Sequence, residues 1–590
     1  MNAKNILRAF ALLLVAVMAI GVFAACAPAE KPAATTAAPN VTTTAEIIPE
    51  NLELHILVAN DSSNIDFNDR EQYNVWKPFA EWCAAKKLTI TWEIVEKDQY
   101  QAALVGYMAG PMNEMPDAFW TNEGNLSTAS RTQLVDNGRL VALEDILPYS
   151  DGTAKTWYET HPLFQAAKQY KGKTYWVGSY QEVYWHGEAQ PNGGGAVKGI
   201  TIRLDWYDKL VEMGKWDEAK GMPNTMEEIG EFLQACRDND MNGNGEADEY
   251  YLNYIADFAA TGLGNLMGIP RAHFAPNLVT GEVTVAWTHK NAKEFMELLI
   301  DWNEKGYFPE DMVGGKSGST KYRTRNQTAV YNTYFCDNWS MVNTEVQEGA
   351  KPAVLIGVLP DKTVHPDAYL ANDSAPTMDN VSLCFTSNLS HPAAAAALLD
   401  IITDAKYAEL MEYGTLTTDD LGKDSVTGSY FIDADGKKVH TTIGADLSNA
   451  KETFITFGAN VFGYYVLPTV GQVYNLESDE LLCLGPDGAF DPTGRMHEVF
   501  VEGMSWPKTY PDQIGGYLAT PTAEEAMALT IYEPIFQELS KELFYSLITG
   551  ETPMTEWDDV IEQLKDEGYM DEIAEIYQAR FSRYLSAYQG

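Results

Sequence analysis

The stretch Leu52-Glu53-Leu54-His55-Ile56-Leu57-Val58 predicts a β-strand, because apolar and branched residues dominate it. A helix is expected over Trp76 to Lys87, and the alternation of residues from Leu88 to Val95 predicts a second strand. Tyr100 to Ala109 is expected to be helical again, and Pro116 to Trp120 predicts a short strand after a turn. This order of elements predicts an α/β fold, with a largely parallel sheet and helices on both of its faces.

The same alternation returns further along the chain. Strands are expected near Val354 to Leu359 and at Val381 to Thr386, and PAAAAALLDIIT (Pro392 to Thr403) predicts a strong helix. Helices are expected to dominate from Ala523 onward, whereas Thr417 to Asp446, rich in Thr, Gly and Asp, is expected to be an exposed loop. The α/β pattern is therefore not confined to the first part of the chain.

The composition excludes several classes of protein. With 590 residues, 45% of them apolar, the chain can bury a large core and has room for about 2 to 4 domains. The net charge of −43 argues against non-specific nucleic-acid binding and against a polybasic hold on anionic lipid. The six cysteines form no CxxC pair, and no HExxH, GxSxG or GxxxxGK[ST] motif is present, so neither a disulfide scaffold nor these catalytic classes are expected.

The N-terminus has the organisation of a secretion signal. Lys4 and Arg8 precede an uncharged, almost wholly apolar run from Ala9 to Ala25, which is short for a membrane span. Small residues just before Cys26 resemble a bacterial lipobox, in which the peptide is cut before the cysteine and its sulfur receives a diacylglycerol. The usual Leu three places before the cysteine is Phe23 here, and an ordinary cleaved signal with an incidental cysteine is the alternative.

The segment after Cys26 supports an anchor. Ala27 to Glu50 is rich in Ala, Pro and Thr, a composition typical of a flexible tether. No later stretch reaches about 20 consecutive apolar residues, so no other part of the chain is expected to span a bilayer. We therefore predict a lipoprotein signal peptide at 1–25 and a disordered tether at 26–50.

Short segments in the rest of the chain occur in a specific order. A Met-Pro-Asp turn precedes a Gly-Arg-Leu segment, an Arg-Leu-Asp-Trp helix start and a Pro-x-Thr helix entry, and Arg and Tyr recur near the end. The segments are Asn113 to Ala118, Gly138 to Leu143, Arg203 to Leu210, Pro223 to Glu228, Ile548 to Glu551 and Arg580 to Tyr584. Together they resemble the bacterial extracellular solute-binding proteins of family 1, the sugar-binding lipoproteins of ABC importers.

The resemblance implies a two-lobed, periplasmic-binding-protein-like fold of type II, in which hinged α/β lobes with mostly parallel central sheets hold a ligand between them. It implies crossings between the lobes near Tyr175 to Gly178, near Ile356 to Pro360 and near Thr403. The expected division is 51–176 for the first part of lobe 1, 177–357 for the first part of lobe 2, 358–403 for the return to lobe 1, and 404–590 for lobe 2 and the C-terminal helices.

The resemblance also implies a function without catalysis. Such a protein, held by lipid at the outer face of the bacterial cell membrane, captures a carbohydrate, expected here to be an oligosaccharide, and delivers it to the transmembrane subunits of an ABC permease. A monomer that does not bind nucleic acid is expected. Two other classes stay open: a secreted glycan-active hydrolase or lyase, for which 84 acidic residues prevent the naming of a carboxylate pair, and a binding protein for a peptide or a polyamine.

The loop Asp240 to Glu249 (DMNGNGEADE) predicts a structural calcium site. Hard cations prefer several oxygen donors, and glycines permit the tight bend that points alternate residues inward. A start at Asp238 gives the standard EF-hand pattern, whereas a start at Asp240 resembles the calcium loop of the solute-binding family; a polar turn without metal is the alternative to both. We favour the register that begins at Asp240. It implies side-chain ligands from Asp240, Asn242, Asn244, Asp248 and Glu249 and the backbone carbonyl of Glu246.

Aromatic residues make up 12% of the chain and supply the candidates for sugar binding. A flat ring packs on the apolar face of a sugar while polar side chains satisfy its hydroxyls, so aromatic residues next to polar ones at strand ends are favoured. The predicted ligand-binding residues are Trp339, Trp120, Trp185, Asp337, Asp379 and Tyr464. For each tryptophan, packing in a core is the alternative.

Overall fold

The computed structural model divides the chain into Met1–Ile48 and a compact unit, Pro49–Gly590, which contains every element described below. Cys26 and the predicted signal peptide lie outside the described residues, and among the described helices none is long and apolar enough to cross a membrane. The structure describes residues 48–60, 67–72, 75–121, 128–185, 188–190, 197–315, 320–334, 355–372, 377–425, 427–434, 436, 438–441, 472–475, 499, 502–503, 505–506, 509–511 and 514–588.

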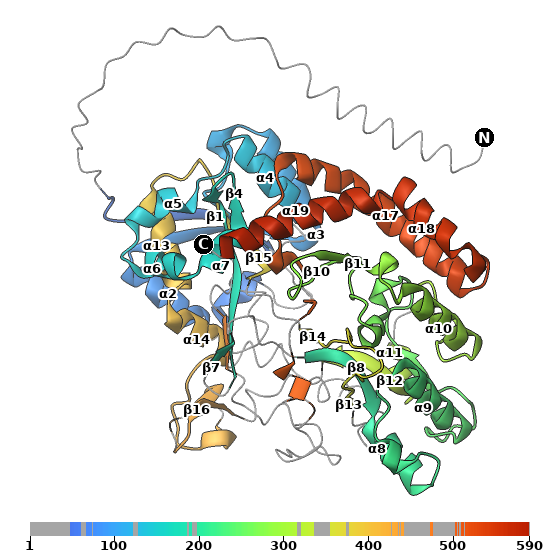
Figure 1. Cartoon of the computed structure of the whole chain (residues 1–590). Coiled ribbons are helices and arrows are strands. Elements are labelled where there is room, and N and C mark those ends of the chain that lie inside the picture. The colour runs from blue at the N-terminus through green and yellow to red at the C-terminus, as the bar shows by residue number, and fades with distance from the viewer. Residues whose placement is uncertain are drawn as a thin grey trace. The chain divides into compact units, whose positions relative to one another are not determined.

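The first sheet combines strands from distant parts of the chain (Figure 1). β1 runs parallel to β2 and β3, as predicted, but β15 runs antiparallel to both β3 and β6. The sheet is therefore mixed: β18 runs parallel to β6, and the predicted parallel arrangement is also found among β1, β2 and β3, whereas β15 interrupts it. The order is β18 (Gln472–Asn475), β6 (Trp176–Trp185), β15 (Thr377–Phe385), β3 (Ala118–Thr121), β1 (Leu52–Asn60) and β2 (Leu88–Glu96), and β7 (Glu188–Gln190) pairs with β6.

Helices cover both faces of the first sheet, as predicted. Leu54, Ile56 and Val58 of β1 pack in one core with α2 (Trp76–Ala85) and α13 (Pro392–Ile402). Leu57 points to the other face and packs in a second core with α3 (Lys97–Ala109) and α4 (Thr128–Asp136). Burial on both faces explains why apolar residues dominate β1.

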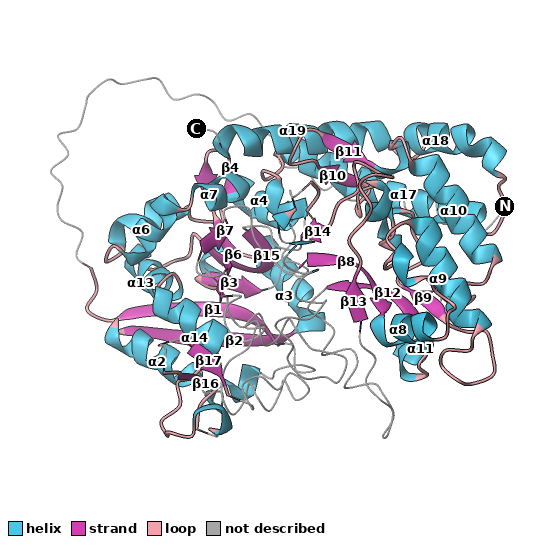
Figure 2. Ribbon diagram, turned by 60° about the horizontal axis from the view of Figure 1, so that its bottom comes forward, coloured by secondary structure: helices cyan, strands magenta, loops and turns pink. Residues whose placement is uncertain are grey.

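The second sheet has its own core, and Figure 2 shows its strands as a separate group flanked by helices. β12 is parallel to β9 and antiparallel to β8, so this sheet is mixed too. The order is β13 (Leu355–Gly357), β8 (Val197–Arg203), β12 (Thr328–Tyr334) and β9 (Tyr250–Leu252), and β14 (Ala371–Asn372) pairs with β8. The helices in its core are α8 (Leu204–Glu212), α9 (Met226–Asp238), α10 (Ala292–Glu304), α17 (Ala523–Ile548) and α18 (Trp557–Asp566).

The last helix, α19 (Met570–Tyr588), packs in the core of the second sheet and also against a helix of the first sheet. Met570, at its start, belongs to the core of the second sheet. Phe581 and Tyr584, near its end, are buried with Ala167 of α7 (Pro162–Lys168), a helix whose Phe164 lies in the core of the first sheet. One helix therefore joins the core of the second sheet to a helix that packs on the first.

The predicted lobe boundaries stay predictions, although the positions of three elements bear on them. β6 begins at the first predicted crossing and lies wholly in the first sheet, and β13 lies in the second sheet at the second predicted crossing. α14 (Ala405–Tyr413) buries Tyr407 and Leu410 in the core of the first sheet, whereas the sequence assigns 404–590 to the other lobe.

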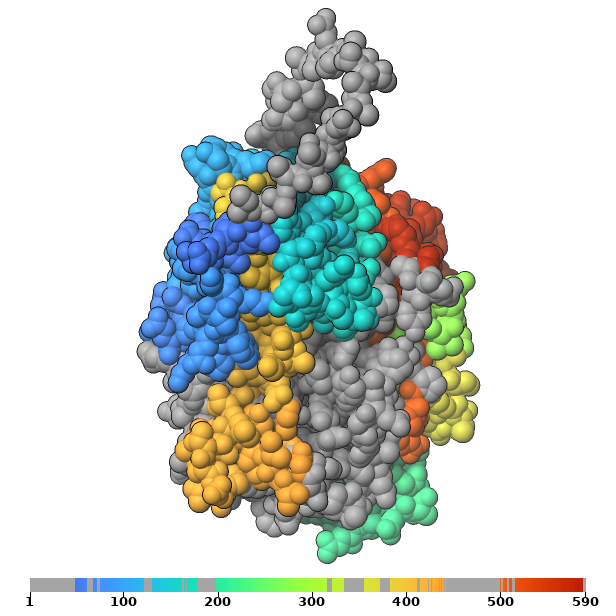
Figure 3. All heavy atoms as spheres, turned by 90° about the vertical axis from the view of Figure 1, so that its left-hand side faces the viewer, coloured from blue at the N-terminus to red at the C-terminus, as the bar shows by residue number. Residues whose placement is uncertain are grey.

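Two short strands lie where the sequence predicts an exposed loop. β16 (Tyr430–Ile432) and β17 (Lys438–His440) pair antiparallel, and the Glu409 carboxylate of α14 accepts a hydrogen bond from Tyr430 Oη (2.9 Å) and pairs with Lys438 Nζ (2.9 Å). Figure 3 shows this segment in orange, below the blue and cyan residues of the first sheet and its helices. The remaining short elements are α5 (Leu143–Ile146), α6 (Thr153–Thr160), α11 (Thr320–Thr324), β4 (Gln169–Tyr170), β5 (Lys173–Thr174), β10 (Phe274–Pro276) and β11 (Val283–Val285).

Candidate functional site

The candidate site that the structure describes in full is the loop between α9 and β9, where the sequence predicts calcium. α9 ends at Asp238, and Asp240, Gly243 and Gly245 then adopt left-handed backbone conformations with φ of +44°, +76° and +85°. Glycine adopts these conformations without a steric penalty because it has no Cβ. The chain can therefore turn back tightly and enter β9.

Side-chain oxygens fix the backbone in the first half of this loop. Asp240 Oδ1 accepts a hydrogen bond from the backbone N–H of Asn244 (3.0 Å), and Asp240 Oδ2 accepts one from Gly245 (2.9 Å). Asn242 Oδ1 also accepts from the backbone N–H of Asn244 (3.1 Å), and Asn244 Oδ1 accepts from that of Glu246 (2.8 Å). The oxygens of Asp240, Asn242 and Asn244 are therefore gathered around one turn of the chain.

Asp248 connects the two halves of the loop. Its carboxylate is buried, and Oδ1 accepts hydrogen bonds from the side-chain amides of Asn242 (2.7 Å) and Asn244 (3.0 Å). Rotation about the last side-chain bond exchanges the oxygen and the nitrogen of such an amide. Asn242 and Asn244 can therefore present N–H donors to Asp248 or oxygen ligands to a cation.

The surroundings of the Glu249 carboxylate indicate whether the loop suits a cation. Its side chain is 0% exposed, Oε1 accepts a hydrogen bond from the backbone N–H of Asn242 (3.2 Å), and Oε2 is buried without a hydrogen-bond partner. Burial raises the pKa of Glu249, because the charged form loses its contact with water. A divalent cation would neutralise this carboxylate and contact the unpaired oxygen, so the residues present fit calcium.

From Asp240 to Glu249 the loop has carboxylates and amides but no His or Cys, and such oxygen donors suit calcium better than a transition metal. In the part of the chain that the structure describes, no group of three or more His, Cys, Asp or Glu side chains is placed to hold a metal ion. Calcium, however, accepts amide and backbone carbonyl oxygens as well as carboxylates. Asp238, where the alternative register begins, accepts a hydrogen bond from Gln234 Nε2 within α9 (2.7 Å) rather than from the loop.

The predicted sugar-binding residues are placed less completely. Trp120 is 4% exposed and lies in the core of the first sheet, with its ring 5.4 Å from that of Trp92. This position agrees with the alternative role of a tryptophan that packs in a core. The backbones of Trp185 and Asp379 belong to β6 and β15 of the same sheet, but their side chains are not described. Trp339, Asp337 and Tyr464 lie outside the described residues, so the ligand-binding role of all these residues stays a prediction.

A polar cluster that the sequence analysis missed lies along β12. The buried Asn332 accepts a hydrogen bond from Arg271 Nη2 (2.7 Å) and donates one from Nδ2 to the carbonyl of Gly262 (2.9 Å). A Cβ on Gly262 would lie 2.4 Å from Asn253 Nδ2, so only glycine fits there. β9 and β12 run parallel, and their carboxyl ends lie at one edge of the sheet, where open α/β sheets bind ligands. An Asn within a buried strand is the one signal that could have pointed to this cluster.

Comparisons with known proteins give matches among solved structures. No protein-family model and no curated protein sequence matches the chain. The alginate-binding protein AlgQ2, in a structure without calcium ion, is 15% identical, with a TM-score of 0.59 over 90% of this chain and 99% of that chain. FusA, an ABC-transporter substrate-binding protein of S. pneumoniae, as an EF-hand mutant in complex with fructo-nystose, is 17% identical, with a TM-score of 0.59 over 90% and 99%. An HMO-binding, ABC-transporter-associated solute-binding protein from Bifidobacterium longum infantis is 17% identical, with a TM-score of 0.62 over 91% and 99%.

These matches concern the architecture of the chain. Each covers 90% or more of this chain, so both sheets and the C-terminal helices take part in the likeness. The two mixed sheets with separate cores agree with it. The chain therefore has the two-lobed α/β fold of the type II periplasmic solute-binding proteins.

Proposed function

We propose that this protein is the substrate-binding component of a carbohydrate ABC importer and captures an oligosaccharide without changing it chemically. The observation that carries the proposal is the extent of the fold likeness, which covers 99% of the length of an alginate-binding protein, of FusA and of an HMO-binding protein. A fold likeness over almost the whole length of three such binding proteins supports the proposal that this chain captures a ligand in the same way.

Sugar capture needs polar groups for the hydroxyls and flat rings for the apolar faces. Asn332 and Arg271 supply an amide and a guanidinium near the edge of the second sheet where β9 and β12 end. The chain continues from β12 toward Asp337 and Trp339. The proposal assigns Asp337 and Trp339 to the ligand, together with Trp120, Trp185, Asp379 and Tyr464. Closure of the hinged lobes on the sugar would then present the closed form to the transmembrane subunits of the permease.

A thermal-shift screen against a panel of oligosaccharides, with the calcium concentration held constant, tests this function. A true ligand raises the free energy of unfolding by about 2.7 kcal/mol at a hundredfold excess over its Kd. Calorimetry and product analysis on each hit should give heat of binding without new products. Steady release of shorter sugars would instead identify a hydrolase or lyase, and binding of a peptide or polyamine but of no sugar would identify a different solute.

We propose that lipid on Cys26 holds the protein at the outer face of the cell membrane. The apolar run that ends in small residues before Cys26, and the Ala-, Pro- and Thr-rich segment after it, support this proposal. Cys26→Ser should abolish the incorporation of labelled palmitate, whereas Cys83→Ser, at a buried free cysteine in the folded body, should not. Equal labelling of the two variants would contradict the anchor.

We propose that the loop from Asp240 to Glu249 binds calcium in the register that begins at Asp240. Bound calcium would offset the negative charge of Asp240, Asp248 and Glu249 and so stabilise the loop, which is a structural role. The structure of AlgQ2 without calcium ion and that of a FusA EF-hand mutant are consistent with a calcium loop in proteins of this fold.

The register is tested by melting temperature with calcium and with EDTA. Extracellular calcium modules bind at about 10⁻⁴ to 10⁻³ M, so millimolar calcium should raise the Tm of the unmodified protein. Asp240→Ala should abolish this increase, whereas Asp238→Ala, at a residue that contacts only α9 in the described hydrogen bonds, should keep it. The reverse pattern would assign the EF-hand register, and the absence of any calcium effect on the unmodified protein would refute the site.

A further inference from the structure

Gln327 contacts the loop between α9 and β9, although it is distant from that loop in the sequence. It directly precedes β12, and its Nε2 donates a hydrogen bond to Asp248 Oδ2 across a separation of 79 residues. The Gln327 carbonyl accepts a hydrogen bond from the N–H of Tyr250 (2.8 Å), and the Gln327 N–H donates to the carbonyl of Tyr322 (2.9 Å). The backbone of Gln327 is therefore fixed next to the end of the loop by contacts that the loop side chains do not provide.

Two side-chain oxygen atoms, on the residue that contacts Asp248 and on the residue that follows it, have no hydrogen-bond partner among the described residues. They are Gln327 Oε1 and Glu249 Oε2, and both are buried. Gln327 is 8% exposed and Glu249 is 0% exposed. Gln327 contacts Asp248 directly and Glu249 follows Asp248 in the chain, so the two unpaired oxygens belong to two neighbours of Asp248. A buried unpaired oxygen costs free energy in a residue that serves packing alone, whereas a metal centre uses such oxygens as ligands or to orient its ligands.

We infer that Gln327 is a positioning residue of the calcium site, an inference that rests on the proposed site itself. Its Nε2 donates to Oδ2 of Asp248, which Asn244 Nδ2 also contacts (3.0 Å), while Oδ1 accepts from the amides of Asn242 (2.7 Å) and Asn244 (3.0 Å). Asp248 is thereby kept in the orientation that gathers the loop. The loop does not form the site by itself, because Gln327, the residue before strand β12, contributes one of its contacts.

Calcium affinity, measured by isothermal titration on the EDTA-treated protein, tests the inference. Gln327→Leu removes the amide at nearly constant volume. Loss of a residue that orients metal ligands changes metal affinity by about 10- to 100-fold, so we expect the Kd for calcium to rise at least tenfold. Thr328→Val is the matched control, because Thr328 is the next residue, is 7% exposed, and its Oγ1 also lacks a hydrogen-bond partner. This control should bind calcium with unchanged affinity.

Gln327→Glu separates positioning from folding and decides the question if the leucine variant does not fold. The glutamate cannot donate to Asp248 and places a third carboxylate beside Asp248 and Glu249, so it should lower the Tm in EDTA by repulsion and, because the positioning contact is lost, raise the Kd for calcium as the leucine variant does. A glutamine with only a structural role would change the Tm equally with and without calcium. Unchanged calcium affinity in the variants that fold, when the unmodified protein binds calcium, overturns the inference. An unmodified protein that binds no calcium overturns the calcium site and this inference with it.

Discussion

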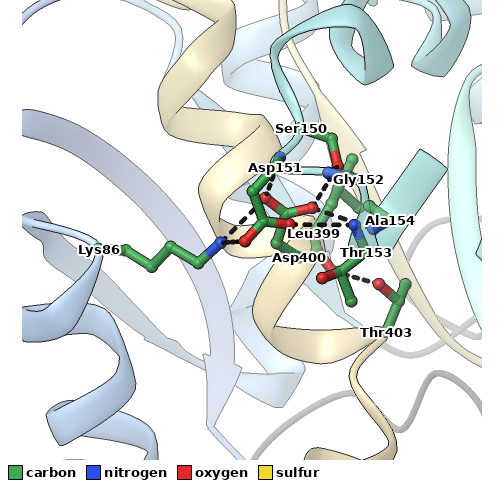
Figure 4. Close-up of polar contacts among 9 residues, drawn as sticks. All are labelled: Lys86, Ser150, Asp151, Gly152, Thr153, Ala154, Leu399, Asp400 and Thr403. Atoms are coloured by element: carbon green, nitrogen blue, oxygen red, sulfur yellow. Dashed lines mark hydrogen bonds and ion pairs between the residues drawn. The ribbon is translucent and has the colours of Figure 1, made fainter. Parts of the chain in front are cut away.

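Replacing Asp400 by Asn should destabilise the core of the first sheet. Asp400 lies in α13 and is 4% exposed. Its carboxylate accepts hydrogen bonds from Ser150 Oγ, from the backbone N–H groups of Asp151 (3.0 Å) and Ala154 (3.0 Å), and from Lys86 Nζ (3.0 Å), as Figure 4 shows. One carboxylate therefore ties together the end of α2, the start of α6 and the body of α13.

The magnitude follows from what asparagine cannot accept. Asparagine offers one oxygen instead of two, so part of this set of donors is left without an acceptor. A hydrogen bond to a charged group contributes about 1.5–3 kcal/mol, and a buried donor left unpaired costs about 1–3 kcal/mol. Lys86 is partly exposed and also pairs with Asp151 (2.5 Å). Water and Asp151 therefore partly replace the ion pair that Lys86 loses with Asp400. We expect Asp400→Asn to lower the free energy of unfolding by about 3 kcal/mol.

Urea unfolding, followed by tryptophan fluorescence, measures this change. The matched control is Asp404→Asn, at the partly exposed residue that caps α14 by accepting a hydrogen bond from the backbone N–H of Lys406 (2.8 Å). Asn caps helices about as well as Asp, so the control should stay within about 0.5 kcal/mol of the unmodified protein. If Asp400→Asn unfolds at the same urea concentration as Asp404→Asn, the buried carboxylate does not hold these helices together and the reasoning is wrong.

Acid should remove the contribution of the Lys86–Asp151 ion pair. The hydrogen bond from Lys86 lowers the pKa of Asp151 to about 2, so its stabilisation is present above the unfolded pKa of about 3.9 and is lost as the pH falls toward 2. Because Asp151 is half exposed, the contribution is below about 1 kcal/mol. The difference in Tm between the unmodified protein and Asp151→Asn should shrink over this range, and a pH-independent difference would refute the assignment. Gly262→Ala should destabilise by about 3 kcal/mol, because the new Cβ would lie 2.4 Å from Asn253 Nδ2. Gly214→Ala, with φ of +65° and no atom within 4 Å, should cost only about 1 kcal/mol, and equal losses in urea unfolding would contradict the steric argument.

The local elements of the fold were predictable because each depends on neighbouring residues. α2, β2 and α13 begin where the sequence places them. The segments that carry the family resemblance also have local structural roles. Asp117 Oδ2 accepts a hydrogen bond from the backbone N–H of His55 (2.7 Å), and Arg139 donates to the carbonyl of Gly110 (2.9 Å) at the end of α3. Contacts of this kind stabilise the fold whichever ligand is bound. These segments therefore predict the architecture but not the identity of the ligand.

Contacts between distant residues were not predictable. The direction of β15 depends on where the chain re-enters the sheet, and neither its composition nor its length distinguishes a parallel from an antiparallel partner. The loop proposed to bind calcium was visible because its oxygen-bearing residues fall within ten consecutive residues, from Asp240 to Glu249. Gln327 was not, because no pattern connects it with Asp248 across 79 residues. Trp120 shows the same limit, since a tryptophan at a strand end has the same neighbours in sequence whether it faces a ligand or a core.

The central place of β15 affects the order in which the polypeptide can fold during synthesis. Among the described strands β3 and β6 do not pair with each other, and β15, which joins them, leaves the ribosome only after β8, β9, β12, β13 and β14 of the second sheet. Until then β3 and β6 keep open edges, which are able to pair with wrong segments. Closing such a long loop is slow compared with forming any one helix. A chaperone that shields nascent strand edges would therefore act on this chain mainly in the interval before Thr377 to Phe385 emerges.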